Sequence, residues 1–334
     1  MLSSQIDIQE NEIFKRSPEL LSALLKDHTL STEERQVNIF WATNNYADRG
    51  DGYQYSDPIT VEAITGRNGG VIKPRAIKSR EMQQQRRREM AEVFTPSWIC
   101  NKQNNLVDNA WFGRENVFNT EVDTPDGSHS WIPSEGKITF PDGKTWRDYI
   151  NENRLEITCG EAPYLVSRYD TVTGESIPIE RRIGLLDRKL RIVSENTETT
   201  SEWLKAAQSA YKSIYGYEWQ GDNLVLAREA LLYTFIDYYK VKFGHEPQLK
   251  SLQYIAYIIS WNIWQMDGLK GVVPDTCGER RTVEQTFFGD EEHISVCQGC
   301  KNDDIRTHNG IYALIRDWNA TKGKEKIRFI DLIR

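Results

Sequence analysis

The chain of 334 residues contains no apolar run of about 18 residues, the length that a membrane-spanning helix requires. Residues 1–10 lack the basic and then apolar pattern of a secretory signal. Cysteine is scarce, and its number, five, is odd, so the sequence does not carry a disulfide framework. We therefore expect a cytoplasmic protein with no membrane partner.

Two glycine-rich loops that hold phosphate groups are also missing. The sequence has no G-x-G-x-x-G and no G-x-x-x-x-G-K followed by Ser or Thr. This argues against a dinucleotide site and against a phosphate loop. The net charge of -7 argues against non-specific coating of nucleic acid, although a local basic face remains compatible with it.

The residues that are present predict an α/β fold. Residues 155–158, 214–222 and 262–267 are predicted strands that each carry an acid at or near their end. Amphipathic helices are expected over residues 200–213, 223–239 and 252–261. Strands that alternate with helices are typical of a mostly parallel sheet, so we predict a doubly wound, Rossmann-like sheet.

Other local signals predict further elements. Pro18 after Ser17 predicts a helix start, and a second helix is expected to open at residues 31–34 and to carry Val37 and Trp41. Turn signals around residues 123–127 and 141–144 indicate a β-rich insertion over residues 110–150, with a strand at 137–140. A helix is also expected directly after the turn at residues 159–161.

Three acids at strand ends suggest a ligand site. Ligands of doubly wound sheets bind beyond the carboxyl ends of the strands. An ionised carboxylate only accepts hydrogen bonds, so Glu218 suits the ribose hydroxyls and Asp267 suits an adenine amino group. The turn at Cys159 and Gly160 would approach a charged amino-acid moiety. Carboxylates repel pyrophosphate, which leaves an adenosyl ligand without phosphates. Taken alone, a strand and a turn with one glycine also occur as an ordinary structural element.

Four segments, in this order, resemble the adenine-specific DNA methyltransferases of restriction-modification systems. Residues 91–99 resemble the family's Phe-Thr-Pro segment, and residues 155–162 resemble its Asp-Pro-x-Cys-Gly-x-Gly loop. Residues 215–229 resemble the segment that holds the ribose-binding acid, and residues 262–267 resemble the Asn-x-x-x-x-Asp segment that contacts adenine. The resemblance covers roughly residues 86–275 and implies a methyltransferase sheet with S-adenosylmethionine as cofactor.

The resemblance also implies cofactor-binding residues and a domain plan. An active enzyme of this family would transfer a methyl group to the adenine amino nitrogen of double-stranded DNA without a metal. The domains would be a helical segment with a basic arm (1–90), a methyltransferase-like domain (91–275) and a cysteine-containing extension (276–334). The implied cofactor-binding residues are Phe94, Thr95, Pro96, Glu156, Cys159, Gly160, Glu218 and Asp267.

The sequence departs from the family at several positions. Glu156, Ile157 and Ala162 replace the family's Asp, Pro and last Gly. The catalytic tetrapeptide, Asn/Asp-Pro-Pro-Tyr/Phe, is absent, so no catalytic residue can be assigned. Three hypotheses follow: an enzyme of restriction-modification or phage defence completed by a partner subunit, an inactive DNA-binding or complex-forming subunit, and an RNA-modifying enzyme.

A basic stretch at residues 73–88 is the candidate contact to DNA. It contains seven basic residues and one acid, which suits either a phosphate-contacting arm or a solvated helix face. The basic residues are Lys73, Arg75, Lys78, Arg80, Arg86, Arg87 and Arg88.

The C-terminal extension holds a separate candidate metal site. Cys297 and Cys300 form a C-x-x-C pair, with Cys277 twenty residues earlier and His308 eight residues later. These four residues are the ligand types of a tetrahedral structural zinc site. Unligated thiols and a redox role are the alternatives.

Overall fold

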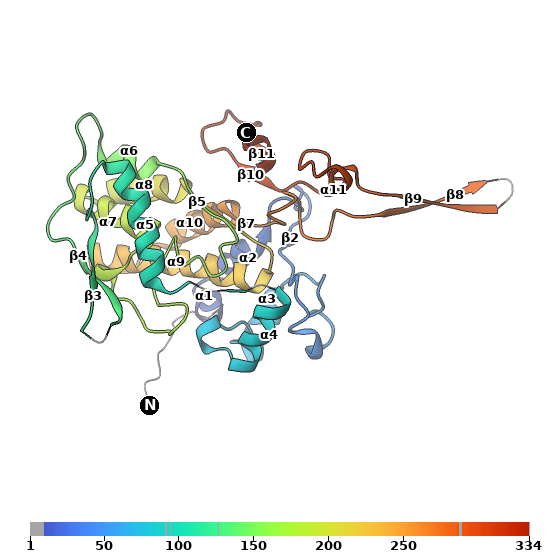
Figure 1. Cartoon of the computed structure of the whole chain (residues 1–334), viewed down its shortest axis with the longest axis horizontal. Coiled ribbons are helices and arrows are strands. Elements are labelled where there is room, and N and C mark those ends of the chain that lie inside the picture. The colour runs from blue at the N-terminus through green and yellow to red at the C-terminus, as the bar shows by residue number, and fades with distance from the viewer. Residues whose placement is uncertain (1–9, 91, 94, 126, 287–288, 334) are drawn as a thin grey trace.

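The computed structural model describes residues 10–90, 92–93, 95–125, 127–286 and 289–333. In this part of the chain, eleven α-helices and eleven strands form a mixed α/β body from which one hairpin projects (Figure 1). None of the described helices is long and apolar enough to cross a membrane. The helices are α1 (Glu10–Arg16), α2 (Pro18–Leu25), α3 (Val61–Ile64), α4 (Arg80–Met90), α5 (Ser97–Phe112), α6 (Trp146–Asn151), α7 (Leu185–Asn196), α8 (Thr200–Lys212), α9 (Gly221–Phe243), α10 (Leu249–Asn262) and α11 (Gln298–Asn302).

The strands are short and fall into five small sheets. They are β1 (Lys26–Asp27), β2 (Val37–Asn38), β3 (Asn119–Asp123), β4 (His129–Pro133), β5 (Arg154–Glu156), β6 (Ile214–Glu218), β7 (Ile263–Gln265), β8 (Arg280–Thr286), β9 (Gly289–Ser295), β10 (Leu314–Arg316) and β11 (Lys326–Arg328).

The central sheet is parallel and has the order β5-β6-β7. Leu155 is paired with Tyr215, and Tyr217 with Trp264, so these side chains share one face. Helices α7 and α8 connect β5 to β6, and α9 and α10 connect β6 to β7. The predicted alternation of parallel strands and helices is therefore confirmed for this part of the chain.

Helix α9 runs through the middle of the molecule and is buried along most of its length. It starts where the chain crosses an N-terminal loop, and the Gly221 amide donates a hydrogen bond to the Trp41 carbonyl at 3.0 Å. A Cβ atom on Gly221 would lie 2.0 Å from the Phe40 carbonyl oxygen. Only glycine therefore fits at this start of the helix.

The two faces of the central sheet are covered differently. Ile214 and Ile263 point into the main core, which α8, α9 and α10 build on one face. On the other face, Tyr217 and Trp264 pack against a C-terminal hairpin formed by β10 and β11, with Phe329 5.2 Å from Trp264 between ring centroids. At these strands, a hairpin thus takes the place that helices hold in a doubly wound sheet.

Strand β5 lies at the edge of the central sheet. Its outer neighbour position is empty within the described residues. Leu155 is 44% exposed and Ile157 is 64% exposed, although both are large apolar side chains. The sheet therefore ends in an edge that is both open and apolar.

Two predicted elements of the N-terminal half are absent. Residues 33–41 do not form the expected helix but contain the two-residue strand β2. Here the backbone amides donate to distant parts of the chain. The Phe40 amide donates to the Gln265 side chain at 3.1 Å, and the Trp41 amide donates to the Asp57 carbonyl at 3.1 Å. Residues 137–140 are not a strand, and the Ile138 amide instead donates to Glu195 at 2.9 Å. The β-rich insertion is confirmed only as the β3–β4 hairpin.

The predicted helix after the turn at 159–161 is also wrong. Residues 161–170 contain turns and the isolated bridge residue Tyr169 but no helix. Ala162 has a φ of 61°, a left-handed conformation that interrupts an α-helix, and the Leu165 amide donates to the Glu156 carboxylate at 3.2 Å. The Glu156 carboxylate also accepts from the Tyr164 amide at 3.4 Å and so holds this non-helical segment against the end of β5.

Candidate functional site

The loop that follows β5 has a strained backbone. Thr158, Gly160 and Ala162 all have a positive φ, of 45°, 53° and 61°. For a residue other than glycine, this conformation costs about 1–2 kcal/mol. The Cys159 amide donates to the Tyr217 carbonyl at 2.8 Å and ties the loop to the end of β6. Strain of this kind is concentrated at ligand sites in proteins.

Glu218, the last residue of β6, holds the same loop. Its Oε2 accepts a hydrogen bond from the Gly160 amide at 2.8 Å, and its Oε1 accepts one from the Gln220 amide at 3.1 Å. Burial raises the pKa of Glu218, and these amide donors oppose that rise. A carboxylate has about four acceptor positions, so it can still accept hydroxyl donors from a ligand.

Glu156, the last residue of β5, forms hydrogen bonds with backbone amides of the loop that follows it. Its carboxylate accepts from the Tyr164 amide at 3.4 Å and from the Leu165 amide at 3.2 Å. Burial raises the pKa of Glu156 well above its usual range, and the nearby Glu218 raises it further. Two buried acids thus lie at the ends of neighbouring parallel strands.

A cavity of about 800 Å³ opens at these strand ends, and we call it the strand-end cavity. Its walls come from α4, the residues that follow α4, the loop after β5 and the start of α9. Among the residues predicted to bind the cofactor, those that line it are Thr95, Glu156, Cys159, Gly160 and Glu218. Segments that are far apart in the sequence therefore line the same strand-end cavity.

Two further predicted cofactor residues, Asp267 and Pro96, are not among the described residues that line the cavity. Asp267 lies in a turn beyond β7, where its Oδ1 accepts from the Leu269 amide at 2.9 Å and from the Lys270 amide at 3.2 Å. Pro96 is the residue before α5 and is not part of the lining. Phe94 lies outside the described residues.

The cavity has aromatic and polar walls that the sequence did not point to. Trp219 and Tyr55 both line it, and the Trp219 Nε1 donates to the Tyr55 hydroxyl at 3.1 Å. Asn223 and Arg88 line it as well. Trp219 follows Glu218 directly, which was a usable signal. Nothing local in the sequence links Tyr55 or Arg88 to this place.

The basic stretch divides into buried and exposed residues. Arg86 is 1% exposed and forms ion pairs with Glu92 at 2.5 Å and with Asp222 at 2.8 Å. Lys78 is also buried, 3.9 Å from both acids. Although burial raises the pKa of Asp222, Arg86 and Lys78 lower it below its usual value. These two cations therefore fasten α4 to the start of α9.

The other five basic residues of the stretch differ in exposure. Arg75 is half-buried, and its amide donates to Glu161 at 2.6 Å. The exposed residues of the stretch are Lys73, Arg80, Arg87 and Arg88. The DNA contact hypothesised from the sequence requires exposed basic side chains, and in residues 73–88 only these four are exposed.

The four predicted metal ligands come together in the C-terminal extension. The ligand atoms of Cys277, Cys297, Cys300 and His308 all lie within 4.8 Å of one another. Cys277 Sγ is 3.3 Å from Cys297 Sγ and 3.5 Å from Cys300 Sγ, and His308 Nδ1 is 3.3 Å from Cys277 Sγ. Ligands of a tetrahedral zinc ion are about 3.6–3.8 Å apart, given the usual Zn–S and Zn–N lengths. This Cys3His cluster can bind a metal ion.

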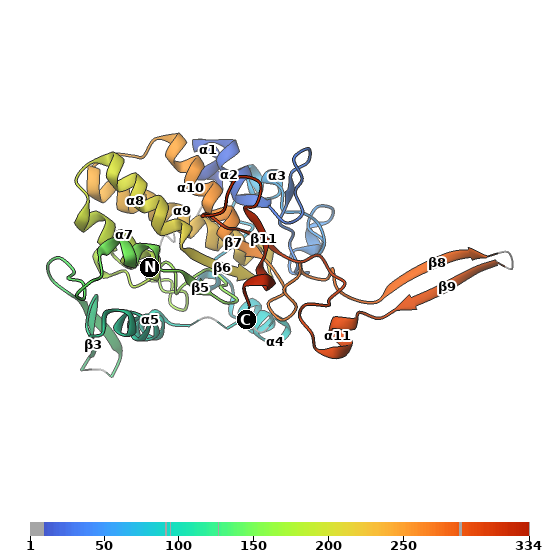
Figure 2. The same cartoon turned by 90° about the horizontal axis from the view of Figure 1, so that it is seen from above.

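The Cys3His cluster lies at the base of the projecting hairpin. Cys277 precedes β8 and Cys297 follows β9, so the two residues flank the hairpin in the sequence. The hairpin itself projects from the body (Figures 1 and 2). The hairpin pairs seven residues of each strand, from Arg280 with Ser295 to Thr286 with Gly289. It extends away from the rest of the molecule in both views.

Comparison with known proteins gives no relative from which a function could be transferred. Searches with family profiles, among curated proteins and among solved structures returned no match. The function of the chain has to be inferred from its own residues and their geometry.

Proposed function

We infer that the chain binds S-adenosylmethionine in the strand-end cavity, on a scaffold of the adenine-specific DNA methyltransferase type. The observation that carries this proposal is the convergence of Thr95, the 156–160 loop and Glu218 on one cavity of about 800 Å³. In this proposal, β5, β6 and β7 represent one half of a doubly wound sheet, with the ligand beyond their carboxyl ends.

The chemistry of the cavity suits an adenosyl ligand. Glu218 offers a buried acceptor for ribose hydroxyls, and Trp219 and Tyr55 offer aromatic surfaces beside it. Burial of an acceptor strengthens its hydrogen bonds, since water does not compete. The cofactor would supply an activated methyl group. The residues of the chain would bind and orient it.

Calorimetry with S-adenosylmethionine tests the proposal. Glu218→Ala should weaken binding about 10- to 100-fold, because hydrogen bonds to a charged group contribute about 1.5–3 kcal/mol. The matched control is Glu198→Ala, at an exposed acid, which should leave the affinity unchanged. Absence of binding by the unaltered chain at millimolar cofactor would refute the cofactor assignment.

The pH dependence of binding gives an independent check. Hydroxyl donors prefer the ionised form of Glu218, while burial raises the pKa of this carboxyl. Binding should therefore release a proton, and the affinity should rise with pH through the raised pKa. In Glu218→Ala this rise should disappear. A pH dependence that is the same in both proteins would contradict the role of Glu218.

The second candidate function is a subunit that needs a partner chain for catalysis or that only binds DNA. Two observations favour it. The sequence has no catalytic tetrapeptide, and among the described residues no strand covers the edge of β5, where Leu155 and Ile157 expose apolar surface next to the cavity. Transfer of tritium from labelled cofactor to adenine-containing DNA separates the two functions. Incorporation by the isolated chain would rule out the partner-dependent form, and competition with RNA would identify an RNA substrate.

We also propose that the Cys3His cluster holds a structural zinc ion. All four tetrahedral positions are filled by protein ligands, which is typical of structural rather than catalytic sites. Metal analysis of the purified chain should give one zinc per chain, and Cys300→Ser should reduce it. Cys100→Ser is the control, because Cys100 is not part of the cluster. A zinc content near zero in the unaltered chain would refute this assignment.

A further inference from the structure

Aromatic rings and cations alternate where α10 packs against the C-terminal hairpin of β10 and β11. The Lys212 Nζ lies 5.5 Å from the ring centroid of Tyr254 and 5.3 Å from that of Trp318. The Arg316 guanidinium lies 5.1 Å from the Trp318 centroid and 5.6 Å from that of Tyr257. We call this set the ring–cation surface, and it comprises Lys212, Tyr254, Tyr257, Arg316, Trp318 and Lys326.

Helix α10 supplies two of these rings and carries no acid. Tyr257 follows Tyr254 by three residues, and Lys250 precedes Tyr254 by four, so the three lie on the same side of the helix. The sequence of α10 contains no Asp and no Glu. No carboxylate of α10 can therefore neutralise the cations that lie beside its rings.

The C-terminal hairpin brings an excess of positive charge to the same place. Residues 314–328 contain five basic residues and two acids. Asp317 accepts from the Asn319 amide at 2.9 Å. Glu325 accepts from the Gly323 amide at 2.7 Å through Oε2, and its Oε1 lies 3.8 Å from Arg316. Both acids thus have partners within the segment, and the basic residues outnumber them.

The rings and the lysines of this surface reach solvent. Tyr254 is 37% exposed, Lys326 is exposed, and Lys212 and Trp318 are half-buried. The Lys326 Nζ lies 5.8 Å from the ring centroid of Trp261. Apart from such ring contacts, the Nζ atoms of the two lysines form no hydrogen bond or ion pair with the described residues. Each ammonium group therefore keeps its donors for an anionic partner.

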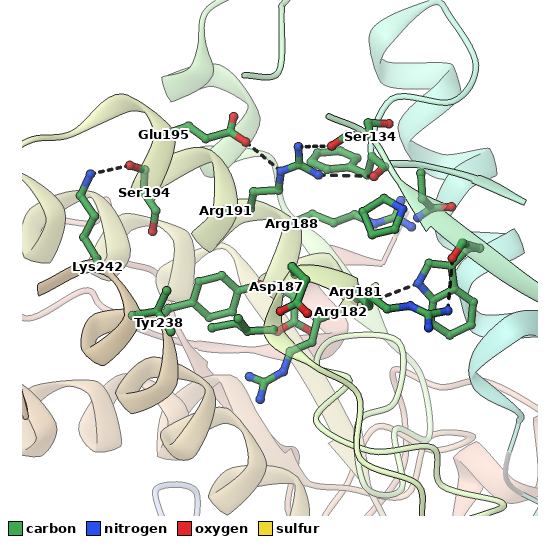
Figure 3. Close-up of a pocket in the computed structure, with 17 residues that line it drawn as sticks. Ser134, Arg181, Arg182, Asp187, Arg188, Arg191, Ser194, Glu195, Tyr238 and Lys242 are labelled. Atoms are coloured by element: carbon green, nitrogen blue, oxygen red, sulfur yellow. Dashed lines mark hydrogen bonds and ion pairs between the residues drawn. The ribbon is translucent and has the colours of Figure 1, made fainter. Parts of the chain in front are cut away.

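The cavity of about 480 Å³ between β4, α7 and α9 shows the contrasting case (Figure 3). Cations and a tryptophan ring also meet there, but the cations are engaged within the chain. Arg191 donates to Glu195 at 2.8 Å, and Arg181 donates to the Trp131 carbonyl at 3.2 Å. The exposed acid Glu180 lines the same cavity. These arginines therefore have less capacity for an outside anion than the two lysines of the ring–cation surface.

The positive charge of the ring–cation surface also acts on a histidine beneath it. Burial, followed by the charges of nearby cations, lowers the pKa of His28 to about 2. Those cations are Arg228, Lys26, Lys326 and Arg316. Several like charges therefore act on one point, and a bound anion would reduce the repulsion among them.

The ring–cation surface lies at the end of the sheet away from the strand-end cavity. Lys212 ends α8 just before β6, and the Trp318 Nε1 donates at 2.9 Å to Asn262, the last residue before β7. The surface is therefore near the amino ends of these strands, whereas the strand-end cavity opens at carboxyl ends. It is also separate from the exposed arginines of α4, since Figure 1 shows α4 below the central helices and β10 and β11 above them.

We propose that the ring–cation surface binds single-stranded DNA, with an unpaired base on the ring of Tyr254 and phosphates at Lys212 and Lys326. Proteins that hold unpaired strands combine aromatic rings, on which bases stack, with cations that contact the backbone. The bases of a duplex are stacked on one another and do not offer a face to such rings. The choice of DNA rests on the proposed function, while the surface shares no residue with the strand-end cavity.

Fluorescence anisotropy with a labelled, unstructured single-stranded DNA dodecamer tests the proposal. The strand should bind with a dissociation constant of about 1–100 µM, the range of sequence-independent binding. The duplex of the same sequence and polyglutamate, an anion without bases, should compete poorly. If the single strand does not bind, or if either competitor binds as tightly, the proposal is wrong. Tighter binding of the RNA of the same sequence would overturn the choice of DNA.

Paired variants separate stacking from charge. Tyr254→Leu, which removes the ring, should weaken binding about fivefold or more, whereas Tyr254→Phe, which keeps it, should bind as the unaltered chain does. Lys212→Gln combined with Lys326→Gln should flatten the slope of log affinity against log salt by about 0.7 for each lost phosphate contact. Lys102→Gln combined with Lys137→Gln, at exposed lysines elsewhere, is the control and should leave the slope unchanged. An unchanged melting temperature shows that each variant is folded.

Binding of the strand elsewhere is recognised by the same assay. If Tyr254→Leu and the variant of Lys212 and Lys326 bind as the unaltered chain does, the ring–cation surface is not the site. Arg87→Glu combined with Arg88→Glu should leave single-strand binding intact, and so should Glu218→Ala. Loss of binding only in these two would place the strand at α4 or at the strand-end cavity and overturn the proposal. The test of S-adenosylmethionine is unaffected by either result, because it uses the cofactor without DNA.

Discussion

Glu229 in α9 is fully buried, and neither of its carboxylate oxygens has a hydrogen-bond partner within the described residues. Burial raises its pKa well above the usual range, and the charge of Glu10 raises it further. Burial also raises the pKa of Glu10, from 4.5 to about 7. Folding therefore makes this pair hold protons more tightly than the unfolded chain does.

A pH dependence of stability follows from this pair. Both folded pKa values are raised, so the stability that each acid contributes is fully present below the unfolded value of about 4.5. The contribution of Glu10 is lost as the pH rises through about 7, and that of Glu229 as the pH rises through its own raised pKa. Glu229→Gln should weaken this loss and stabilise the chain at pH 8 by more than about 1 kcal/mol. Urea unfolding at pH 5 and pH 8 measures both effects. Glu12→Gln, at a surface acid, is the control and should change neither value.

The buried and exposed arginines of α4 should differ strongly in their effect on stability. Arg86→Met leaves the buried acids Glu92 and Asp222 without their main partner, which should cost about 3–5 kcal/mol in unfolding free energy. Arg87→Met, at the exposed neighbour, should stay within about 0.5 kcal/mol. Urea denaturation at neutral pH measures both. Equal effects would contradict the assignment of Arg86 as the residue that fastens α4.

At the scale of helices and strands, prediction from the sequence is most accurate where the spacing of apolar residues within a segment determines its structure. The strands β6 and β7 and the helices α8, α9 and α10 all fall close to their predicted ranges. Residues 33–41 satisfy a helical pattern, but their amides are used by Gln265 and Asp57, which no local pattern contains. In this segment, long-range hydrogen bonds outweighed the local helix propensity.

The same distinction applies to the candidate site. Glu218, Gly160 and Cys159 could be predicted because each lies at the end of a recognisable strand. Tyr55 reaches the strand-end cavity only through the fold, so local sequence carries no signal for it. The burial of Arg86 was not predictable either, because one of its two acidic partners, Asp222, lies 136 residues further along the chain.

The projecting hairpin should depend on the proposed zinc site at its base. An isolated two-stranded hairpin is marginally stable in water, so closure by Cys277 and Cys297 is expected to stabilise β8 and β9. Removal of the metal with a chelator should speed amide hydrogen exchange in residues 280–295, while α9 keeps its protection. Unchanged exchange in the hairpin after complete metal loss would contradict this dependence.

At the scale of the whole molecule, an acidic chain carries a small exposed basic group. The net charge is -7, while Lys73, Arg80, Arg87 and Arg88 remain available for phosphates. With at most four phosphate contacts, the slope of log affinity for duplex DNA against log salt should be no steeper than about -4. Arg87→Glu combined with Arg88→Glu should weaken binding and flatten the slope. A much steeper slope would require basic contacts elsewhere in the chain.

The open edge at β5 also has a consequence for how the protein behaves in solution. Leu155 and Ile157 expose apolar surface at a strand edge that no other strand of the described part covers, which is the combination that favours edge-to-edge aggregation. At neutral pH the net charge of -7 keeps molecules apart by mutual repulsion. Acidification protonates carboxylates and removes this repulsion. The chain should therefore stay dispersed at neutral pH and precipitate first from concentrated, mildly acidic solutions.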